Sequence, residues 1–170
     1  MPSELKRREE QLLATFAGHR GNVVSKLRDL YGFMDEINTF VAGFTPCKKG
    51  CSHCCHIPVV VSTLEIEYIR KHVRKLRIKI ADSPVSDYDS PCPFLIKGSC
   101  SIYEVRPFVC RRHITLAADS FWCHPDRCNN IKLTRLSFTE IDKVYNQILD
   151  ESGGLTKQFD IRIIQNRSAK

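Results

Sequence analysis

Residues 47 to 55 read Cys47-Lys48-Lys49-Gly50-Cys51-Ser52-His53-Cys54-Cys55, which places four cysteines within nine positions. A lone cysteine is most simply explained as a small buried apolar side chain. That explanation does not account for four cysteines so close together, whereas clustered thiolates are the usual ligands of zinc and of iron–sulfur clusters. The stretch therefore predicts a metal site, and we expect the fold to be organised around it.

The four cysteines cannot all reach one metal ion from a straight helix. On an ideal helix their side chains fall within an arc of about 100°, but Cys47 and Cys55 stand about 12 Å apart along the axis. The sulfur ligands of one tetrahedral zinc are only about 4 Å apart. Lys48-Lys49-Gly50 is also poor helix sequence. We therefore expect a loop that wraps the metal, with later cysteines completing the ligand set, and spacing alone does not distinguish iron from zinc.

A second group of cysteines follows at positions 92, 100 and 110, with two more at 123 and 128. Lys97-Gly98 stands between two apolar runs and predicts a turn that brings Cys92 and Cys100 together. Neither group is a complete ligand set by itself. We therefore predict that at least one metal takes ligands from both groups.

The motifs of the two groups resemble those of one known family. They are Cys-x3-Cys-x2-Cys-Cys from Cys47, Cys-Pro-Phe-Leu from Cys92, Gly-x-Cys-Ser-Ile-Tyr-Glu-x-Arg-Pro from Gly98, and Cys-Arg at Cys110. Together they are similar to the YkgJ-type cysteine-cluster proteins, which are described as zinc- or iron-chelating and look related to the flagellin lysine N-methylases. The resemblance covers residues 47 to 128, and Cys128 is peripheral to the shared pattern. It implies eight metal ligands, namely Cys47, Cys51, Cys54, Cys55, Cys92, Cys100, Cys110 and Cys123.

The composition limits the class of protein. The chain has 170 residues, 42% of them hydrophobic, and a formal net charge of +7, which suits a globular domain with a real core. No apolar run reaches the roughly 18 residues that a membrane span needs, and the start of the chain lacks the apolar region of an export signal. We expect a cytoplasmic protein with no membrane partner, whose nine cysteines stay reduced and bind metal.

The remaining patterns predict a mostly α-helical small domain with a cysteine-rich, metal-stapled middle and little β structure. Ser62 and Ser137 each begin a Ser-x-x-Glu capping box, the usual signal of a helix start. Apolar periodicity and these signals predict helices over residues 3–16, 22–41, 62–76 and 137–153. We also expect a short strand over residues 159–164 and a loop over 82–93. N-terminal helices (1–46), a metal-binding region (47–136) and a C-terminal helix and tail (137–170) should form one compact domain.

The excess positive charge lies in one segment. Residues 47 to 81 carry eight basic and two acidic side chains, whereas residues 1 to 46 and 137 to 170 are each neutral. On the expected helix, the basic residues from Arg70 to Lys79 lie opposite the apolar face, as on a solvated surface. The functional alternative is an unknown protein or anionic partner that binds this basic helix. Nucleic acid is disfavoured because no aromatic residues are interleaved and no nucleic-acid motif is present.

Other polar side chains near the cysteines are expected to be neighbours of the metal. The cysteines alone fill two four-ligand sites, so no ligand role is assigned to the histidines at 53, 56, 113 and 124. A nucleophilic Cys110–His113 pair is disfavoured because a metal-bound cysteine has no free thiolate. Arg106 and Tyr103 should pack or hydrogen-bond around the metal.

Three functions follow from these observations. The favoured one is an iron–sulfur protein with a 4Fe-4S cluster, redox-active or sensing. The second is a zinc-stabilised interaction module, and the third is an enzyme linked to S-adenosylmethionine-dependent protein lysine methylation. Cys47, Cys51 and Cys54 share the spacing of radical S-adenosylmethionine enzymes, but the alternating strand–helix units of such barrels are missing. The sequence leaves enzymatic activity open and assigns no catalytic residue.

Overall fold

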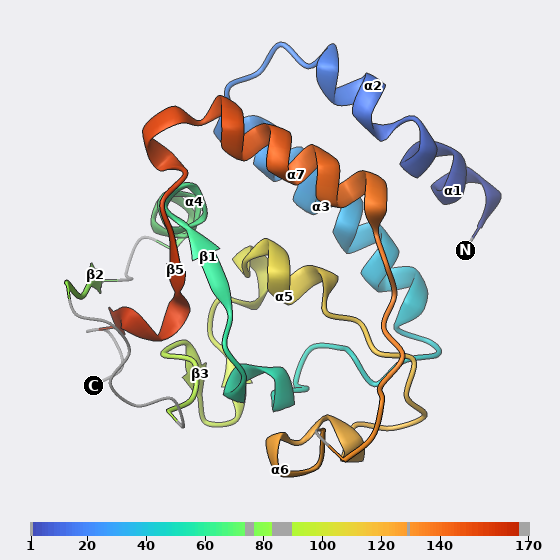
Figure 1. Ribbon diagram of the computed structural model, residues 1–170, viewed down its shortest axis with the longest axis vertical. Coiled ribbons are helices and arrows are strands. Elements are labelled where there is room, and N and C mark those ends of the chain that lie inside the picture. The colour runs from blue at the N-terminus through green and yellow to red at the C-terminus, as the bar shows by residue number, and fades with distance from the viewer. Residues whose placement is uncertain (1, 74–76, 83–89, 129, 167–170) are drawn as a thin grey trace.

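The computed structural model describes residues 2–73, 77–82, 90–128 and 130–166. Helices dominate these residues, and the strands are short (Figure 1). The α-helices of the described residues are α1 (Ser3–Glu10), α2 (Leu12–Ala17), α3 (Val23–Val41), α4 (Thr63–His72), α5 (Phe108–Arg112), α6 (Pro125–Cys128) and α7 (Thr139–Glu151). Short 3-10 turns are η1 (His53–His56), η2 (Tyr103–Val105), η3 (Phe121–Cys123), η4 (Gly153–Leu155) and η5 (Ile161–Ile163). The expected mostly α-helical fold is confirmed.

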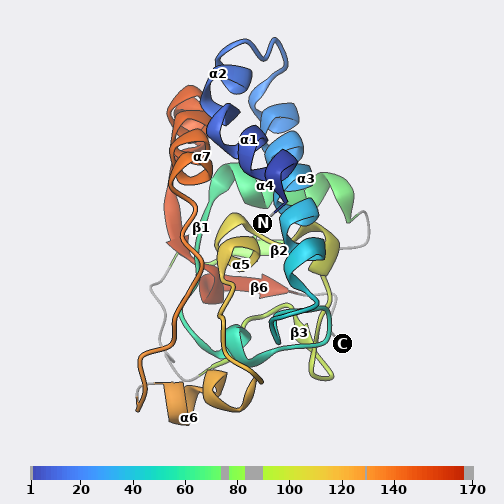
Figure 2. The ribbon, with the colours of Figure 1, turned by 90° about the vertical axis from the view of Figure 1, so that its right-hand side faces the viewer.

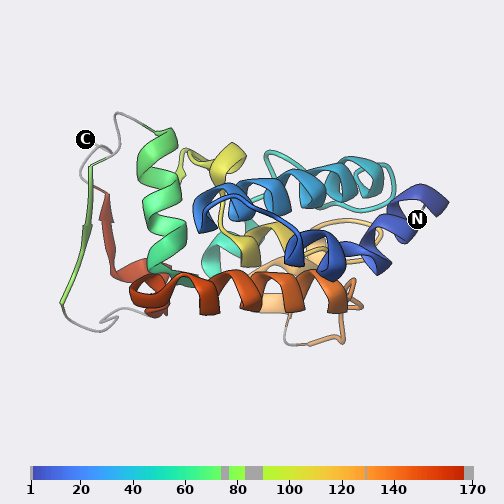
Figure 3. The same cartoon turned by 90° about the horizontal axis from the view of Figure 1, so that it is seen from above.

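Four helices form one half of the molecule. α3 and α7 lie side by side, and α1 and α2 pack against them (Figures 1 and 3). Asn22 caps α3, since its side chain accepts the N–H of Ser25 at 3.0 Å. The helix predicted over residues 22–41 is therefore confirmed. Its buried apolar side chains and those of α7 recur every three or four residues: they include Leu27, Leu30, Met34 and Ile37 on α3, and Ile141, Val144 and Ile148 on α7.

The capping box predicted at Ser62 is present at the start of α4. The N–H of Glu65 donates to the Ser62 hydroxyl at 3.2 Å, and the N–H of Ser62 donates to the Glu65 carboxylate at 2.7 Å. The Glu65 carboxylate is almost fully buried and also accepts from the hydroxyls of Tyr31 and Tyr145 and from the N–H of Phe108, at 2.7–2.9 Å. One side chain thus ties α3, α5 and α7 to α4.

The second capping box, predicted at Ser137, is wrong. α7 begins at Thr139, its N-cap residue is Phe138, and no side chain caps it. The Phe138 side chain is buried among the helices, 4% exposed. Packing of this ring, rather than a hydroxyl cap, sets where α7 begins.

The basic helix predicted from Arg70 to Lys79 is wrong in its second half. α4 ends at His72, and Ile78–Ile80 form strand β2, antiparallel to β6 (Ile164–Asn166). β-branched residues on both sides of Lys79 are typical of a strand. The predicted helix end near residue 76 and most of the predicted loop over 82–93 lie outside the described residues.

The strands of the described residues pair in three separate two-stranded antiparallel sheets. Besides β2 with β6, these are β1 (Val60–Ser62) with β5 (Gln158–Asp160), and β3 (Leu95–Ile96) with β4 (Ser99–Cys100). The strand predicted over residues 159–164 is present in part, because η5 interrupts it. The Asp160 side chain starts that turn by accepting the N–H of Arg162 at 2.9 Å.

The buried apolar side chains form two clusters with α4 between them. The helical core joins α2, α3 and α7, and α4 contributes Leu64 and Tyr68 to it. The second core lies under β1 and η5, and α4 contributes Ile66 and Ile69 to it. Seen from the side, the four helices occupy one end of the molecule, with the β3 hairpin and α6 at the other (Figure 2). No helix among the described residues is both long and apolar enough for a membrane span.

Candidate metal centre

The first cysteine group lies on a turning loop that leads into η1. Gly50 has a φ of +96°, in the left-handed region that glycine adopts without strain. The N–H of Cys51 donates to the carbonyl of Lys48 at 3.0 Å. The chain therefore reverses between Cys47 and Cys51, as the poor helix sequence predicted, and Cys54 and Cys55 follow on η1.

The second group is held by the β3–β4 hairpin. Lys97 and Gly98 have φ values of +48° and +75°, which are the angles of a two-residue hairpin turn. Cys100 ends β4 and Cys92 lies just before β3, so the predicted turn and the approach of these two cysteines are confirmed.

Backbone contacts bring the groups together. The N–H of Cys92 donates to the carbonyl of Cys55 at 2.7 Å, which links the second group directly to η1. On the other side, α6 packs against η1 and η3, and the rings of His53 and His124 lie 5.7 Å apart. This contact carries the late cysteines of η3 and α6 back to the first group.

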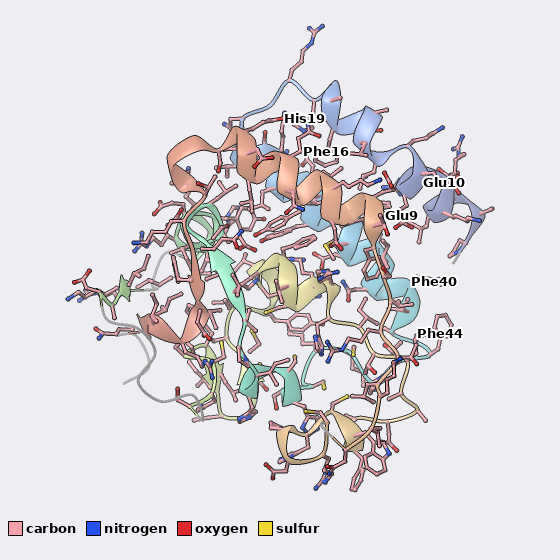
Figure 4. The ribbon with its side chains drawn as sticks, viewed as in Figure 1. Glu9, Glu10, Phe16, His19, Phe40 and Phe44 are labelled. Carbon is pink, nitrogen blue, oxygen red and sulfur yellow. The ribbon has the colours of Figure 1, made fainter. Side chains whose placement is uncertain are left out.

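A cavity of about 520 Å³ lies where these segments meet. The sulfur atoms gather in the lower half of the view in Figure 4, below α5. All nine cysteines line the cavity as free thiols, and they are Cys47, Cys51, Cys54, Cys55, Cys92, Cys100, Cys110, Cys123 and Cys128. Cys128, expected to be peripheral, thus lies with the other eight.

The nine thiols surround the cavity, but they do not converge on one position where a single ion would bind. In the described part of the chain, no three cysteine, histidine, aspartate or glutamate side chains converge as the ligands of a single ion do. The other walls of the cavity are largely apolar and include Ile57, Val59, Ile102, Val109 and Ile161.

Residues 46–129 match the model of the CxxCxxCC family, described as a "putative zinc- or iron-chelating domain". The cysteine-rich segment is similar to this family over 84 of the chain's 170 residues. The match confirms the resemblance seen in the motifs, and the chelating domain spans η1, the β3 hairpin, α5 and α6. Searches of curated proteins and of solved structures found no match.

Burial favours the protonated form of three thiols of the chelating domain, Cys92, Cys110 and Cys123. It raises the pKa of Cys92 to about 12 and that of Cys123 to about 11, and it also raises the pKa of Cys110 well above its usual range. The pKa of Cys54 is raised first by a hydrogen bond with Cys55 and then by burial. Because metals bind the thiolate form, metal binding must release these protons. Soft sulfur donors such as these suit zinc or an iron–sulfur cluster.

Arg106 supplies a fixed positive charge beside the thiols. Arg106 is 7% exposed and lines the cavity. Its charge lowers the pKa of Cys54, against the Cys55 hydrogen bond and burial, and lowers the pKa of Cys100 against burial. It lies 4.0 Å above the centre of the Tyr103 ring and donates to the Tyr103 carbonyl at 2.9 Å. Asp35 of α3 lies 3.5 Å from it. The predicted contact of Arg106 and Tyr103 around the site is thus present.

Two further residues fix the position of Arg106, and sequence reasoning missed both. Arg111 is 1% exposed and donates to the Arg106 carbonyl at 2.9 Å and to the Asp35 carboxylate. Asp35 lies on α3, outside the cysteine-rich segment, so no spacing rule connects it with the cysteines. The Cys-Arg motif at Cys110 was the only signal for Arg111.

Cys47 accepts a backbone hydrogen bond. The N–H of Thr115 lies 3.4 Å from its sulfur and lowers the pKa of Cys47 against the larger effect of burial. Such a bond favours the thiolate form, which a metal also requires. Nothing in the sequence around Thr115 signals this contact.

Some of the histidines near the cysteines line the cavity. His53 and His113 line the cavity, and burial lowers the pKa of each, so the neutral ring is favoured. His124 meets His53 edge to face. Cys110 has a raised pKa, the opposite of an activated nucleophile, which agrees with the expectation against a Cys110–His113 pair.

Proposed function

We propose that the cavity of the chelating domain holds an iron–sulfur cluster and that the protein acts in electron transfer or redox sensing. The observation that carries this proposal is nine thiols around one space of about 520 Å³. A water molecule in the liquid occupies about 30 Å³, and the sulfurs of a single zinc stand only about 4 Å apart. The space is therefore large for one ion and suits a polynuclear centre.

The surroundings support a redox role. The walls of the cavity are largely apolar, the cysteines are partly buried, and the Arg106 charge is fixed beside the thiols. Burial, net charge and nearby hydrogen bonds are the features that tune the potential of an iron–sulfur cluster. The residues present thus offer both the donors and the environment that such a cluster requires.

The proposal is tested by purifying the full chain under anaerobic conditions. We expect a brown protein with broad visible absorption, iron and acid-labile sulfide in equal amounts, and a paramagnetic signal after reduction. A colourless protein that contains zinc and no sulfide would exclude the iron–sulfur proposal.

One observation favours the zinc-stabilised interaction module as a second candidate. Phe121 and Trp122 form an exposed edge-to-face pair on η3, and they are 52% and 40% exposed. Exposed aromatic side chains are enriched where partners bind. The same purification separates the two candidates, since zinc is colourless.

The methylation hypothesis remains the third candidate. Methylation needs S-adenosylmethionine, and the sheets of the described residues are three isolated pairs rather than repeated strand–helix units. The test is equilibrium dialysis of the anaerobic protein against labelled S-adenosylmethionine, in which saturable binding would favour an enzyme.

An anionic partner at residues 70 to 79 also remains a proposal. Lys71 and Lys79 are exposed, whereas Arg70 is paired with Glu67 at 2.6 Å and donates to the carbonyl of Ile78. The basic surface therefore spans the end of α4 and strand β2 instead of one helix.

A further inference from the structure

Exposed apolar side chains gather in one stretch of the chain. Seven large apolar side chains of the described residues are exposed, and four of them lie between positions 116 and 131. They are Leu116, Phe121, Trp122 and Ile131, with exposed fractions of 37–52%. A single exposed apolar side chain needs no explanation, but several together are typical of a surface that binds a partner. We name residues 116–128 and 130–135 the outer segment.

Local contacts give the outer segment a defined shape. The N–H of Leu116 donates to the carbonyl of Thr134 at 2.9 Å, so the two ends of the segment lie side by side. Arg127 lies 4.0 Å above the centre of the Phe121 ring and donates to the Phe121 carbonyl at 3.1 Å. α6 also packs against η3. The exposed side chains are therefore carried by a folded surface, at the end of the molecule away from the four helices (Figure 2).

The outer segment forms one side of the metal cavity. Cys123 of η3, Cys128 of α6 and Arg135 all line the cavity. Thr115 pairs with Arg135 in an isolated antiparallel bridge and donates its N–H to the sulfur of Cys47. Trp122 directly precedes Cys123 in the sequence. A protein that covered this surface would therefore lie next to the thiols.

This side of the cavity carries exposed positive charge. Lys48, Lys132 and Arg135 are exposed, and in the described part of the chain none of them forms an ion pair. No described residue that lines the cavity is acidic. The outer segment and Lys48 together carry four basic and two acidic side chains.

The two acidic side chains of the outer segment already have local partners. Asp119 accepts the N–H of Phe121 at 2.8 Å, and Asp126 lies 3.4 Å from Nδ1 of His124. The basic side chains therefore remain available to a partner of the opposite charge.

We infer that the outer segment is a docking surface for an acidic protein, which covers this side of the metal cavity. The exposed apolar side chains form the centre of the interface, and the basic side chains attract and orient the partner. Interfaces of this limited size are typical of transient redox encounters. The inference deepens the proposed function by naming the class of partner, and it rests on that function only for what the partner does there.

Two other occupants fit the surface less well. A second copy of the chain would place basic side chains against basic side chains, which like-charge repulsion opposes. A single-stranded nucleic acid needs free aromatic faces for stacking. Here Arg127 covers one face of Phe121, Trp122 meets that ring edge to face, and Leu116 and Ile131 offer no ring at all.

The test measures binding of a labelled peptide to the metal-loaded full chain by fluorescence anisotropy. The probe is an amphipathic helical peptide with a leucine face flanked by glutamates, and the comparison peptide has lysine in place of each glutamate. We expect the acidic peptide to bind at least about tenfold more tightly than the basic one, with an affinity that falls as salt is added.

Four variants locate the binding site. Trp122→Ala should weaken binding of the acidic peptide at least about tenfold, because exposed tryptophans are frequent hot spots. Lys132→Glu should weaken it about fivefold and reduce its salt dependence. Phe44→Ala and Lys71→Glu are the matched controls, since both side chains are exposed and lie outside the outer segment, and each should change the affinity by less than about twofold.

The metal content of each variant is measured alongside its affinity. Lys132 does not line the cavity, so Lys132→Glu still decides the question if Trp122→Ala loses metal. Binding that Lys71→Glu weakens and Lys132→Glu does not would assign the peptide to the basic surface at residues 70 to 79 and overturn the inference. Absence of binding by the acidic peptide would also overturn it.

The remaining outcomes separate the inference from its alternatives and from the proposed function. Tighter binding of a single-stranded oligonucleotide than of the acidic peptide, or a dimer of the chain that Trp122→Ala dissociates, would overturn the acidic partner. A zinc-loaded protein that binds the acidic peptide through Trp122 and Lys132 would contradict the iron–sulfur proposal and support the docking surface. An iron–sulfur protein that does not bind it would have the opposite meaning.

Discussion

Glu65 shows at the scale of one residue how this small protein holds four of its helices together. A buried carboxylate is stable only when its oxygens accept hydrogen bonds. Glu65 accepts from two tyrosine hydroxyls and two backbone N–H groups, which come from α3, α5, α7 and the start of α4. The capping box visible in the sequence was thus only part of its role.

Replacing Glu65 with alanine should destabilise the fold strongly. The change leaves Tyr31, Tyr145 and the N–H of Phe108 without their acceptor inside the protein. Each unsatisfied buried group costs about 1–3 kcal/mol, so we expect a total loss of about 3 kcal/mol or more. Urea unfolding of the metal-loaded protein measures this loss in the free energy of unfolding. Glu67→Ala on the same helix is the control and should change the free energy of unfolding by less than about 1 kcal/mol. Equal effects of the two changes would refute the role of Glu65.

Replacing Arg106 with glutamine should weaken metal binding. Its charge favours the thiolate forms of Cys54 and Cys100, and the loss of a group that supports metal ligands costs about 10- to 100-fold in affinity. Competition with a chelator at constant pH measures the change. Arg8→Gln is the control, because Arg8 pairs with Glu36 on the helical layer. An Arg106→Gln protein with unaltered affinity would show that the charge does not act on the metal.

The elements differ in how well the sequence predicts them. α3 was predictable from its one apolar face, and the β3–β4 turn from Lys97-Gly98 between two apolar runs. The start of α7 and the end of α4 depend on tertiary contacts, namely burial of Phe138 and pairing of β2 with β6. Local patterns do not report such contacts.

The same distinction holds for the metal site. Seven of the eight family cysteines were visible in motifs and Cys123 followed from the family resemblance, and the structure brings all eight to one cavity. Asp35 and Thr115 reach the site through folding alone, from α3 and from the segment after α5. The aromatic pairs labelled in Figure 4, Phe16 with His19 and Phe40 with Phe44, lie instead where the chain leaves α2 and α3.

A glycine in the hairpin turn offers a test at the scale of an element. Gly98 has a φ of +75°, where a side chain costs about 1–2 kcal/mol. We expect Gly98→Ala to lower the free energy of unfolding by about 1 kcal/mol and to lower metal affinity through Cys100. Gly32→Ala on the exposed side of α3 is the control, and helix propensity predicts the opposite sign, a gain of about 0.5–1 kcal/mol. Thermal unfolding and chelator competition of both variants measure these effects, and a stabilised Gly98→Ala would contradict the turn geometry.

At the scale of the whole molecule, metal should reverse the dependence of stability on pH. In the metal-free protein, burial raises the pKa of Cys92 to about 12 and of Cys123 to about 11 from an ordinary value near 9. Above about pH 9 the unfolded chain therefore gives up these protons first, and the folded state loses stability as the pH rises. In the loaded protein the thiolates are bound to metal, so protonation removes the metal and stability is lost as the pH falls.

Urea unfolding across a pH series, with and without metal, measures this reversal. The urea midpoint of the metal-free protein should fall as the pH rises above about 9. The metal-loaded protein should have the higher midpoint at neutral pH and lose that difference as the pH falls. Parallel curves for the two forms would show that the buried thiols are not the groups that bind the metal.

The pairing of β1 with β5 also has a consequence for synthesis of the chain. The last family cysteine stands at position 123, but Ile161 of η5, which follows β5 directly, is part of the cavity wall. A ribosome therefore releases all of the metal-binding thiols before it releases the segment that closes over them. During that interval the thiols are open to a donor of metal. The order of residues along the chain therefore allows metal to bind before the C-terminal segment closes over the cavity.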